Sequence, residues 1–141
     1  MQPPIANISA SLNRTRPLTE RLAILIWAAT PDRPELCVTP LVHALAARAL
    51  DAEVEIHFAG PTVRWLIADI ADNAWVTEGR EKSIGDFLRE VLAAGASLYA
   101  CGMARAAWIT EQDVLLPQAG AAGATAFVAR TLDPAWRTLV Y

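Results

Sequence analysis

The sequence predicts an α/β fold, namely a three-layer α/β/α domain with a mainly parallel sheet of about five strands. Segments with strand character alternate with segments of helical periodicity along most of the chain, which is the order that produces parallel sheets. Hydrophobic residues make up 54% of the sequence and charged residues 19%, as expected for a sheet covered on both faces or for a subunit that buries surface in an oligomer. The length of 141 residues indicates one domain with a substantial core.

We expect this single domain to span residues 21–141, after an N-terminal extension over residues 1–20 that is rich in Pro, Asn, Ser and Thr and loosely ordered. The extension lacks a basic segment followed by an apolar one, so we do not expect a secretory signal. The longest apolar run, residues 22–29, is far shorter than the ~20 residues that span a bilayer. The sequence therefore predicts a soluble, cytoplasmic protein with no membrane partner.

Five segments are predicted as strands. Residues 22–29 form a continuous apolar run between charged residues and Thr-Pro, which is typical of a strand buried on both faces. Residues 53–59 alternate in polarity, and residues 96–100 form a short strand. Residues 124–128, after two glycines, and residues 137–141 at the C-terminus are the last two predicted strands.

The clearest predicted helix begins after Ser83, which forms a capping box with Asp86, and ends at Gly95. An earlier helix has apolar residues at helical spacing from residue 41 to 49, and it begins either at Thr39 with Pro40 or near Glu35.

Three shorter segments complete the pattern. Gly60 and Pro61 open a short helical piece, whereas residues 69–82 lack any period and indicate an irregular surface excursion. A second capping box, Thr110 to Asp113, predicts a helical turn over residues 114–116.

Cys101 is the candidate nucleophile because it stands where the predicted strand 96–100 passes into a helix. In parallel sheets, ligand-binding and catalytic residues typically lie at the carboxyl ends of the strands. The backbone N–H groups of Gly102 and Met103 at the helix start, with the helix dipole and the charge of Arg105, would favour a thiolate there. The alternative is a buried cysteine that only packs.

Cys37 is the chain's other cysteine and is a possible second thiol if its loop lies beside Cys101, although the preference of cysteine for buried positions favours a helix-packing role. The spacing of the two cysteines fits neither a zinc site nor a disulfide-rich secreted scaffold. His43 and His57 are isolated, so no metal site is predicted, and a base near a thiol is their alternative role.

Several function classes lack support. The net charge of −3 and the scattered Lys and Arg residues give no basic surface for nucleic acid. No glycine-rich dinucleotide loop, Walker lysine or serine nucleophile elbow is present. We therefore predict no organic cofactor.

The chain resembles the DsrE/DsrF-like family over about residues 21–141. The similarity is carried by residues 54–58 with Gly60, and by residues 82–88, 95–103, 109–115 and 123–128. The resemblance implies a parallel α/β/α fold, assembly into homo-oligomeric trimers or hexamers or into hetero-oligomers with related subunits, and a functional cysteine at Cys101. It also implies persulfide chemistry, with sulfur donor and acceptor proteins as partners. Two departures are the N-terminal extension and His57, which stands where relatives often have an aromatic or aliphatic residue.

The leading hypothesis is a sulfur-relay protein, either a sulfurtransferase or a sulfur carrier, that accepts and passes sulfane sulfur through Cys101. The alternative is a non-catalytic oligomeric module that binds a small ligand or a protein in a cleft lined by Trp65, Trp108 or Tyr99. A redox pair of Cys37 and Cys101 is a third possibility.

Overall fold

The computed structural model describes residues 20–141, so the extension predicted over residues 1–20 lies, apart from Glu20, outside the described residues. In chain order the elements are β1 (Arg21–Ile26), α2 (Glu35–Ala49), β2 (Glu53–Phe58), the 3₁₀ helices η1 (Gly60–Leu66) and η2 (Ala71–Asn73), α3 (Ile84–Ala93), β3 (Ser97–Ala100), α4 (Gly102–Trp108), β4 (Ala119–Ala121), α5 (Ala124–Leu132) and β5 (Trp136–Val140).

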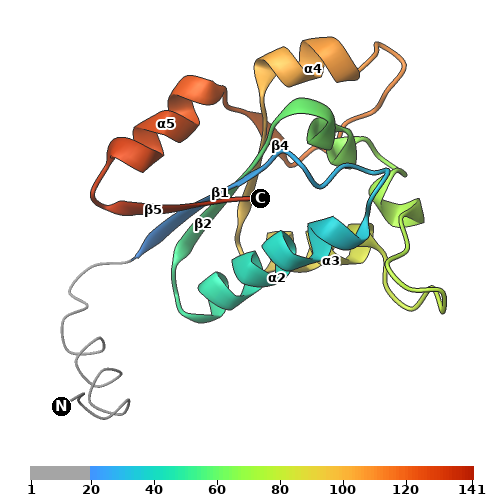
Figure 1. Cartoon of the computed structure of the whole chain (residues 1–141), viewed down its shortest axis with the longest axis horizontal. Coiled ribbons are helices and arrows are strands. Elements are labelled where there is room, and N and C mark those ends of the chain that lie inside the picture. The colour runs from blue at the N-terminus through green and yellow to red at the C-terminus, as the bar shows by residue number, and fades with distance from the viewer. Residues whose placement is uncertain (1–19) are drawn as a thin grey trace.

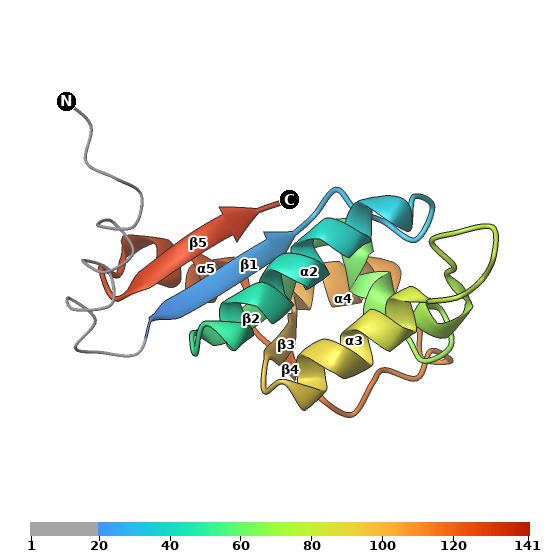
Figure 2. The same ribbon diagram turned by 90° about the horizontal axis from the view of Figure 1, so that it is seen from below.

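The strands form one five-stranded sheet in the order β4-β3-β2-β1-β5, and every neighbouring pair is parallel. Helices α2 and α3 lie on one face of this sheet, and α4 and α5 lie on the other (Figures 1 and 2). The three-layer α/β/α fold predicted from the sequence is confirmed. In the described residues, no helix combines the length and the apolar character that crossing a bilayer requires.

The main hydrophobic core lies between the sheet and the layer formed by α2 and α3. Alternate residues of β1, β2 and β3 point into it, among them Ile24, Ile56 and Leu98, which are at most 1% exposed. Helix α2 adds Leu41, and α3 adds the stripe that includes Val91. This apolar layer accounts for most of the buried side chains and fixes the register of the sheet.

The opposite face of the sheet differs because it carries polar groups. Glu55 and His57 alternate with the core residues of β2 and are nevertheless 7% and 4% exposed. Helix α5 covers this face, yet none of its residues, all within the described part of the chain, is buried. Glu55 and His57 must therefore find their hydrogen-bond partners among the residues between the sheet and α5.

The predicted capping box of α3 is confirmed. The Asp86 backbone N–H donates to Ser83 Oγ at 3.1 Å, and the Ser83 N–H donates to Asp86 Oδ2 at 2.9 Å. Gly95 follows the helix with φ +97°, the left-handed conformation that glycine adopts without strain. Helix α2 begins at Glu35, the second of the two predicted starts, since Pro34 at its N-cap already has the helical values φ −61° and ψ −29°.

Three sequence-based predictions of local structure need correction. The segment predicted as a strand over residues 124–128 is the start of helix α5, and the edge strand is instead β4, just before it. The predicted helical turn over residues 114–116 is extended, because Leu115 forms a bridge with Ile67 and the Leu116 N–H donates to the Leu66 carbonyl. The first strand ends at Ile26 rather than at residue 29.

Candidate functional site

Cys101 stands where β3 ends and α4 begins. It is the N-cap of α4, with φ −65° and ψ 129°, so its backbone continues the extended path of the strand. Its N–H donates to the Phe58 carbonyl at 3.0 Å, and its own carbonyl accepts from the Arg105 N–H at 2.9 Å. The thiol is free and half-buried, so it is fixed in place and yet reachable.

A cavity of about 190 Å³ opens beside this thiol. Cys101 and His57 supply its thiol and its imidazole. The remaining walls are largely apolar and include Leu25 of β1, Phe58 and Ala59 at the end of β2, and Ala124, Phe127 and Val128 of α5. Pockets for drug-sized ligands measure roughly 300–1,000 Å³, so this one suits a small reactant or a single inserted side chain.

The imidazole of His57 is held in place by aromatic neighbours. Its ring stacks on Tyr99 of β3 with the ring centres 5.2 Å apart, and the edge of Phe127 of α5 approaches it at 5.4 Å. His57 and Tyr99 are register partners in the parallel pairing of β2 with β3. Both therefore point to the same face of the sheet, under α5.

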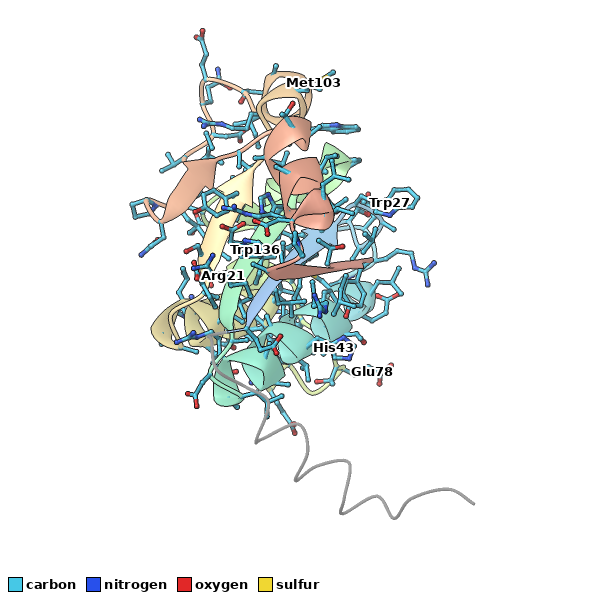
Figure 3. All side chains as sticks on the ribbon, turned by 90° about the vertical axis from the view of Figure 1, so that its left-hand side faces the viewer. Arg21, Trp27, His43, Glu78, Met103 and Trp136 are labelled. Atoms are coloured by element: carbon cyan, nitrogen blue, oxygen red, sulfur yellow. The ribbon has the colours of Figure 1, made fainter. Side chains whose placement is uncertain are left out.

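Glu55 connects His57 to the charged end of α5. Its Oε2 lies 3.0 Å from His57 Nε2, and Arg130 reaches both carboxylate oxygens, at 2.8 Å and 3.1 Å. The guanidinium of Arg130 also lies 4.2 Å above the ring of Trp136, beside which Arg21 is placed (Figure 3). The result is a continuous chain of contacts from Arg130 through Glu55 to the imidazole that lines the cavity.

The electrostatics of this chain favour an ionised Glu55. Burial alone raises the pKa of its carboxyl group, but the hydrogen bonds from Arg130 and His57 outweigh burial and hold the pKa below its usual value of 4.5. The same carboxylate raises the pKa of the Arg130 guanidinium. An ionised carboxylate only accepts hydrogen bonds, so the ring N–H of His57 is assigned to Nε2.

The three residues predicted to stabilise a thiolate at Cys101 lie on the first turns of α4 and are all exposed. Gly102 is the first residue of the helix, and Met103 projects outward with 84% of its surface exposed (Figure 3). Arg105 is also exposed and, like the other two, does not line the cavity. The Cys101 side chain makes no capping hydrogen bond to the helix.

Cys37 lies in a different part of the molecule. It is fully buried within the core formed by α2, where burial raises the pKa of its thiol to about 12. It does not line the cavity beside Cys101, and both cysteines are free thiols. The structure thus places the two predicted thiols in separate layers, on opposite faces of the sheet.

The remaining candidates from the sequence are scattered. His43 is exposed on α2 and its Nδ1 contacts the Tyr141 hydroxyl. Trp65 is fully buried and donates through Nε1 to the Ala29 carbonyl at 2.6 Å, so it cannot line an open cleft. Trp108 on α4 is 45% exposed. Among residues 20–141 no cluster of His, Cys, Asp and Glu side chains could hold a metal ion.

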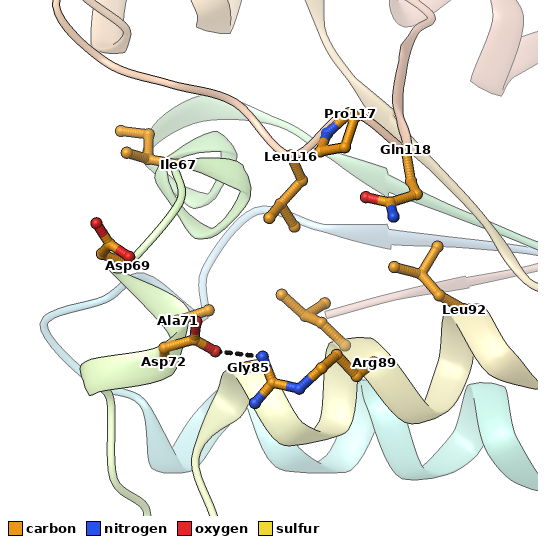
Figure 4. A pocket seen from close by; sticks show the side chains of 11 residues that line it. Ile67, Asp69, Ala71, Asp72, Gly85, Arg89, Leu92, Leu116, Pro117 and Gln118 are labelled. Atoms are coloured by element: carbon orange, nitrogen blue, oxygen red, sulfur yellow. Dashed lines mark hydrogen bonds and ion pairs between the residues drawn. The ribbon is translucent and has the colours of Figure 1, made fainter.

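A second cavity of about 270 Å³ lies between η2, α3 and the segment that precedes β4 (Figure 4). Two of its charged groups already form an ion pair, because Arg89 contacts Asp72 at 2.6 Å, and Arg89 also contacts Asp86 at 2.7 Å. No thiol or imidazole lines it. This cavity therefore offers less chemistry than the one beside Cys101.

Sequence reasoning missed three residues of the site, namely Glu55, Arg130 and Phe127. Glu55 precedes His57 by two positions in a strand of alternating polarity, a spacing that places both on one face. That signal could have predicted a buried pair. Arg130 lies 75 positions from Glu55, and no local pattern connects residues so far apart.

Fold and site together define a small parallel α/β protein with a free thiol at the carboxyl edge of the sheet and a buried imidazole in the same cavity. The chain belongs to the DsrE/DsrF-like family, whose model matches residues 22–141. Among solved structures, the YchN protein of E. coli is similar in fold, with a TM-score of 0.67 and 14% sequence identity over 87% of this chain and 100% of that one. No curated protein matches the sequence.

Proposed function

We propose that this protein carries sulfane sulfur as a persulfide on Cys101 and passes it to an acceptor thiol. Membership of the DsrE/DsrF-like family supports a role related to sulfur relay. The observation that carries the finer proposal is the half-buried free thiol in an apolar cavity of about 190 Å³.

The geometry suits a carrier of reactive sulfur. A persulfide must be reachable by a partner during transfer and shielded from water and oxidants between transfers. Cys101 lies at the end of a strand that is hydrogen-bonded to β2, so the sulfur is held on a rigid element. The largely apolar walls limit access by water, and the cavity volume is large enough for the side chain of a partner cysteine.

The partners proposed for this function are a sulfur donor protein and a sulfur acceptor protein, in an assembly of identical or related subunits. Several large apolar side chains are exposed on β5, on α5 and just after β1, and an assembly that covers this side of the molecule would bury them. They include Trp27, Val128, Leu132 and Val140, which are between 51% and 78% exposed. The transfer itself needs no metal or organic cofactor, because a thiolate is a sufficient nucleophile.

The test is sulfur loading followed by mass spectrometry of the intact protein and its peptides. Incubation with inorganic polysulfide should add about 32 Da, one sulfur atom, to Cys101. The variant Cys101→Ser should lose this adduct, whereas Cys37→Ser, a matched change at the other thiol, should keep it. Loading that persists in Cys101→Ser would refute the proposal.

The alternative function, a non-catalytic binding module, would use the same cavity without sulfur chemistry. Its apolar lining and the aromatic side chains of Tyr99 and Phe127 near it would suit a small apolar ligand. The rate of alkylation distinguishes the two functions. A Cys101 that reacts at neutral pH no faster than a free model thiol would favour binding over relay.

A further inference from the structure

His57 and Cys101 approach the cavity from neighbouring strands and from the same side of the sheet. His57 is the register partner of Tyr99, and Cys101 follows Tyr99 by two residues on an extended backbone. The two residues are therefore diagonal neighbours, with Cα atoms about 8 Å apart if strands lie ~4.8 Å apart and rise ~3.3 Å per residue. Their side chains line one cavity, and a reactant between them would contact both.

The hydrogen bonds of His57 leave one nitrogen available to that reactant. Nε2 is engaged by the Glu55 carboxylate at 3.0 Å. Nδ1 has no hydrogen-bond partner among residues 20–141, and none of the fully enclosed polar side-chain atoms described there lacks a partner. Nδ1 is therefore not fully enclosed, and the cavity is the opening that His57 lines. In the neutral imidazole whose proton lies on Nε2, Nδ1 presents a lone pair.

Hydrogen bonds as well as packing hold the imidazole in place. An apolar side chain would fill the space between Tyr99 and Phe127 without the cost of burying a polar ring. Instead His57 is 4% exposed and oriented by Glu55, which Arg130 holds through two hydrogen bonds. A nucleophile, a base and a carboxylate that orients the base form the arrangement by which many enzymes activate a thiol or hydroxyl.

We propose that His57 transfers the proton in the sulfur-transfer reaction of Cys101, and that Glu55 and Arg130 are positioning residues for its imidazole. This inference rests on the function proposed above. Sulfur carriage by a lone cysteine would not need the contacts among His57, Glu55 and Arg130. The inference gives those contacts a role in proton transfer.

The step balances with a persulfide of the form R–S–SH as donor. The proton of the Cys101 thiol passes to His57 Nδ1 through one bridging water, because the two side chains do not hydrogen-bond to each other directly, and the thiolate attacks the terminal sulfur of the donor. A bond forms between Cys101 Sγ and that sulfur while the S–S bond of the donor breaks, and its electron pair leaves on R–S⁻. His57 returns the proton to R–S⁻. The products are Cys101 persulfide and R–SH, and no external oxidant or reductant is consumed.

The surroundings of His57 define the charges that act on this step. Glu55 of β2 and Arg130 of α5 form an ion pair whose charges cancel, and Tyr99 of β3 stacks on the ring. Cys101 faces the same cavity. The site therefore carries no fixed net charge apart from the reacting groups. A small donor of low charge should load faster than a dianion such as thiosulfate, which would have to leave water for largely apolar walls.

The experiment compares His57→Gln and His57→Phe with His43→Gln, the same change at the chain's other histidine. Glutamine can still donate to Glu55 but cannot serve as a base, whereas phenylalanine preserves the aromatic stack. Loading by inorganic polysulfide and alkylation by iodoacetamide are measured from pH 6 to about pH 10. General acid–base catalysis contributes roughly 100-fold or more, so both His57 variants should load about 100-fold more slowly at pH 7.

The pH profile separates proton transfer from a structural role. The rates of wild type and the His57 variants should converge near pH 10, where an ordinary thiol ionises without help, and His43→Gln should follow wild type throughout. Equal rates at pH 7, or a deficit that is the same at every pH, would overturn the inference. Full activity in His57→Gln with loss in His57→Phe would also overturn it, by showing that only a hydrogen bond to Glu55 matters.

Failure of this inference is distinguishable from failure of the proposed function. If wild type does not load on Cys101, the function fails. If it loads and the His57 variants load equally fast, only the role of His57 fails. Should both variants unfold, ¹⁵N NMR of the imidazole in folded wild type and Cys101→Ser answers the same question. The Nδ1 resonance should differ between these two proteins and change on persulfide loading, and an unchanged resonance would refute the role.

Discussion

Gly85 provides a sharp test of how η2 and α3 pack. A Cβ atom added at this position would overlap Asp72 Oδ1 and would lie 2.9 Å from both the Cα and the backbone N of Asp72. The carboxylate can rotate away if it gives up its exposed ion pair with Arg89, at a cost of up to about 1 kcal/mol. The backbone cannot rotate, so η2 must move away from α3. Gly85→Ala should therefore destabilise the fold.

The magnitude follows from opposing contributions. Overpacking of a closely fitted contact costs about 1–3 kcal/mol, and the lost ion pair adds up to about 1 kcal/mol. Replacing a helical glycine by alanine stabilises the helix by about 1 kcal/mol. The midpoints of these contributions give a net loss of about 1.5 kcal/mol, and their upper ends about 3 kcal/mol, in the free energy of unfolding. Gly102→Ala is the matched control, because Gly102 also lies in the first turn of a helix and no heavy atom lies within 4 Å of its added Cβ. This change should be neutral or stabilising by up to about 1 kcal/mol.

Urea unfolding followed by tryptophan fluorescence measures both variants. Two more variants, Asp72→Ala alone and Asp72→Ala combined with Gly85→Ala, separate the side-chain contact from the backbone contact. The double variant should remain less stable than Asp72→Ala alone, since the Cα and N atoms of residue 72 stay in place. A Gly85→Ala protein as stable as wild type, or full recovery in the double variant, would refute the reasoning.

Two further predictions concern groups with shifted pKa values. Because burial raises the pKa of Cys37 to about 12, iodoacetamide at pH 8 should leave Cys37 unmodified in the native protein and label it only in urea, and native labelling would contradict its placement. The lowered pKa of Glu55 means that its ion pair with Arg130 contributes stability above pH 4.5, and that this contribution is lost as pH falls through the lower folded-state pKa. Glu55→Gln should cost about 2 kcal/mol at pH 7, between the values for exposed and buried pairs. The cost should shrink below pH 4.5 in urea titrations, and one that is independent of pH would be inconsistent with an ionised Glu55.

The sequence predicted the elements whose signals are local. The capping box of Ser83 with Asp86 fixed the start of α3, and the apolar run at β1 identified a central strand, because both signals depend on neighbouring residues. Helix α5 was misassigned as a strand because residues 124–128 are short, apolar and partly β-branched, and periodicity cannot separate a strand from a helix over so few residues. The extended path of residues 114–116 depends on bonding to Ile67 and Leu66, which local patterns do not contain.

The candidate site was predictable in its nucleophile and not in its surroundings. Cys101 follows a recognisable strand, and the carboxyl edge of a parallel sheet is where reactive groups gather. Its neighbours in the cavity come from β1, β2 and α5, so their meeting depends on the strand order. The contact between Arg130 and Glu55 joins a helix to a strand across 75 residues. Only the tertiary fold reveals why a glutamate and a histidine can be buried on β2.

The unequal anchoring of the two helical layers has a consequence for access to the thiol. Local stability rises with the number of buried apolar contacts, and α5 has no buried residue while α3 has five. Transient detachment of α5 would widen the entrance to Cys101 and leave the α2 and α3 side intact. Such local opening of α5 would make Cys101 more accessible without global unfolding.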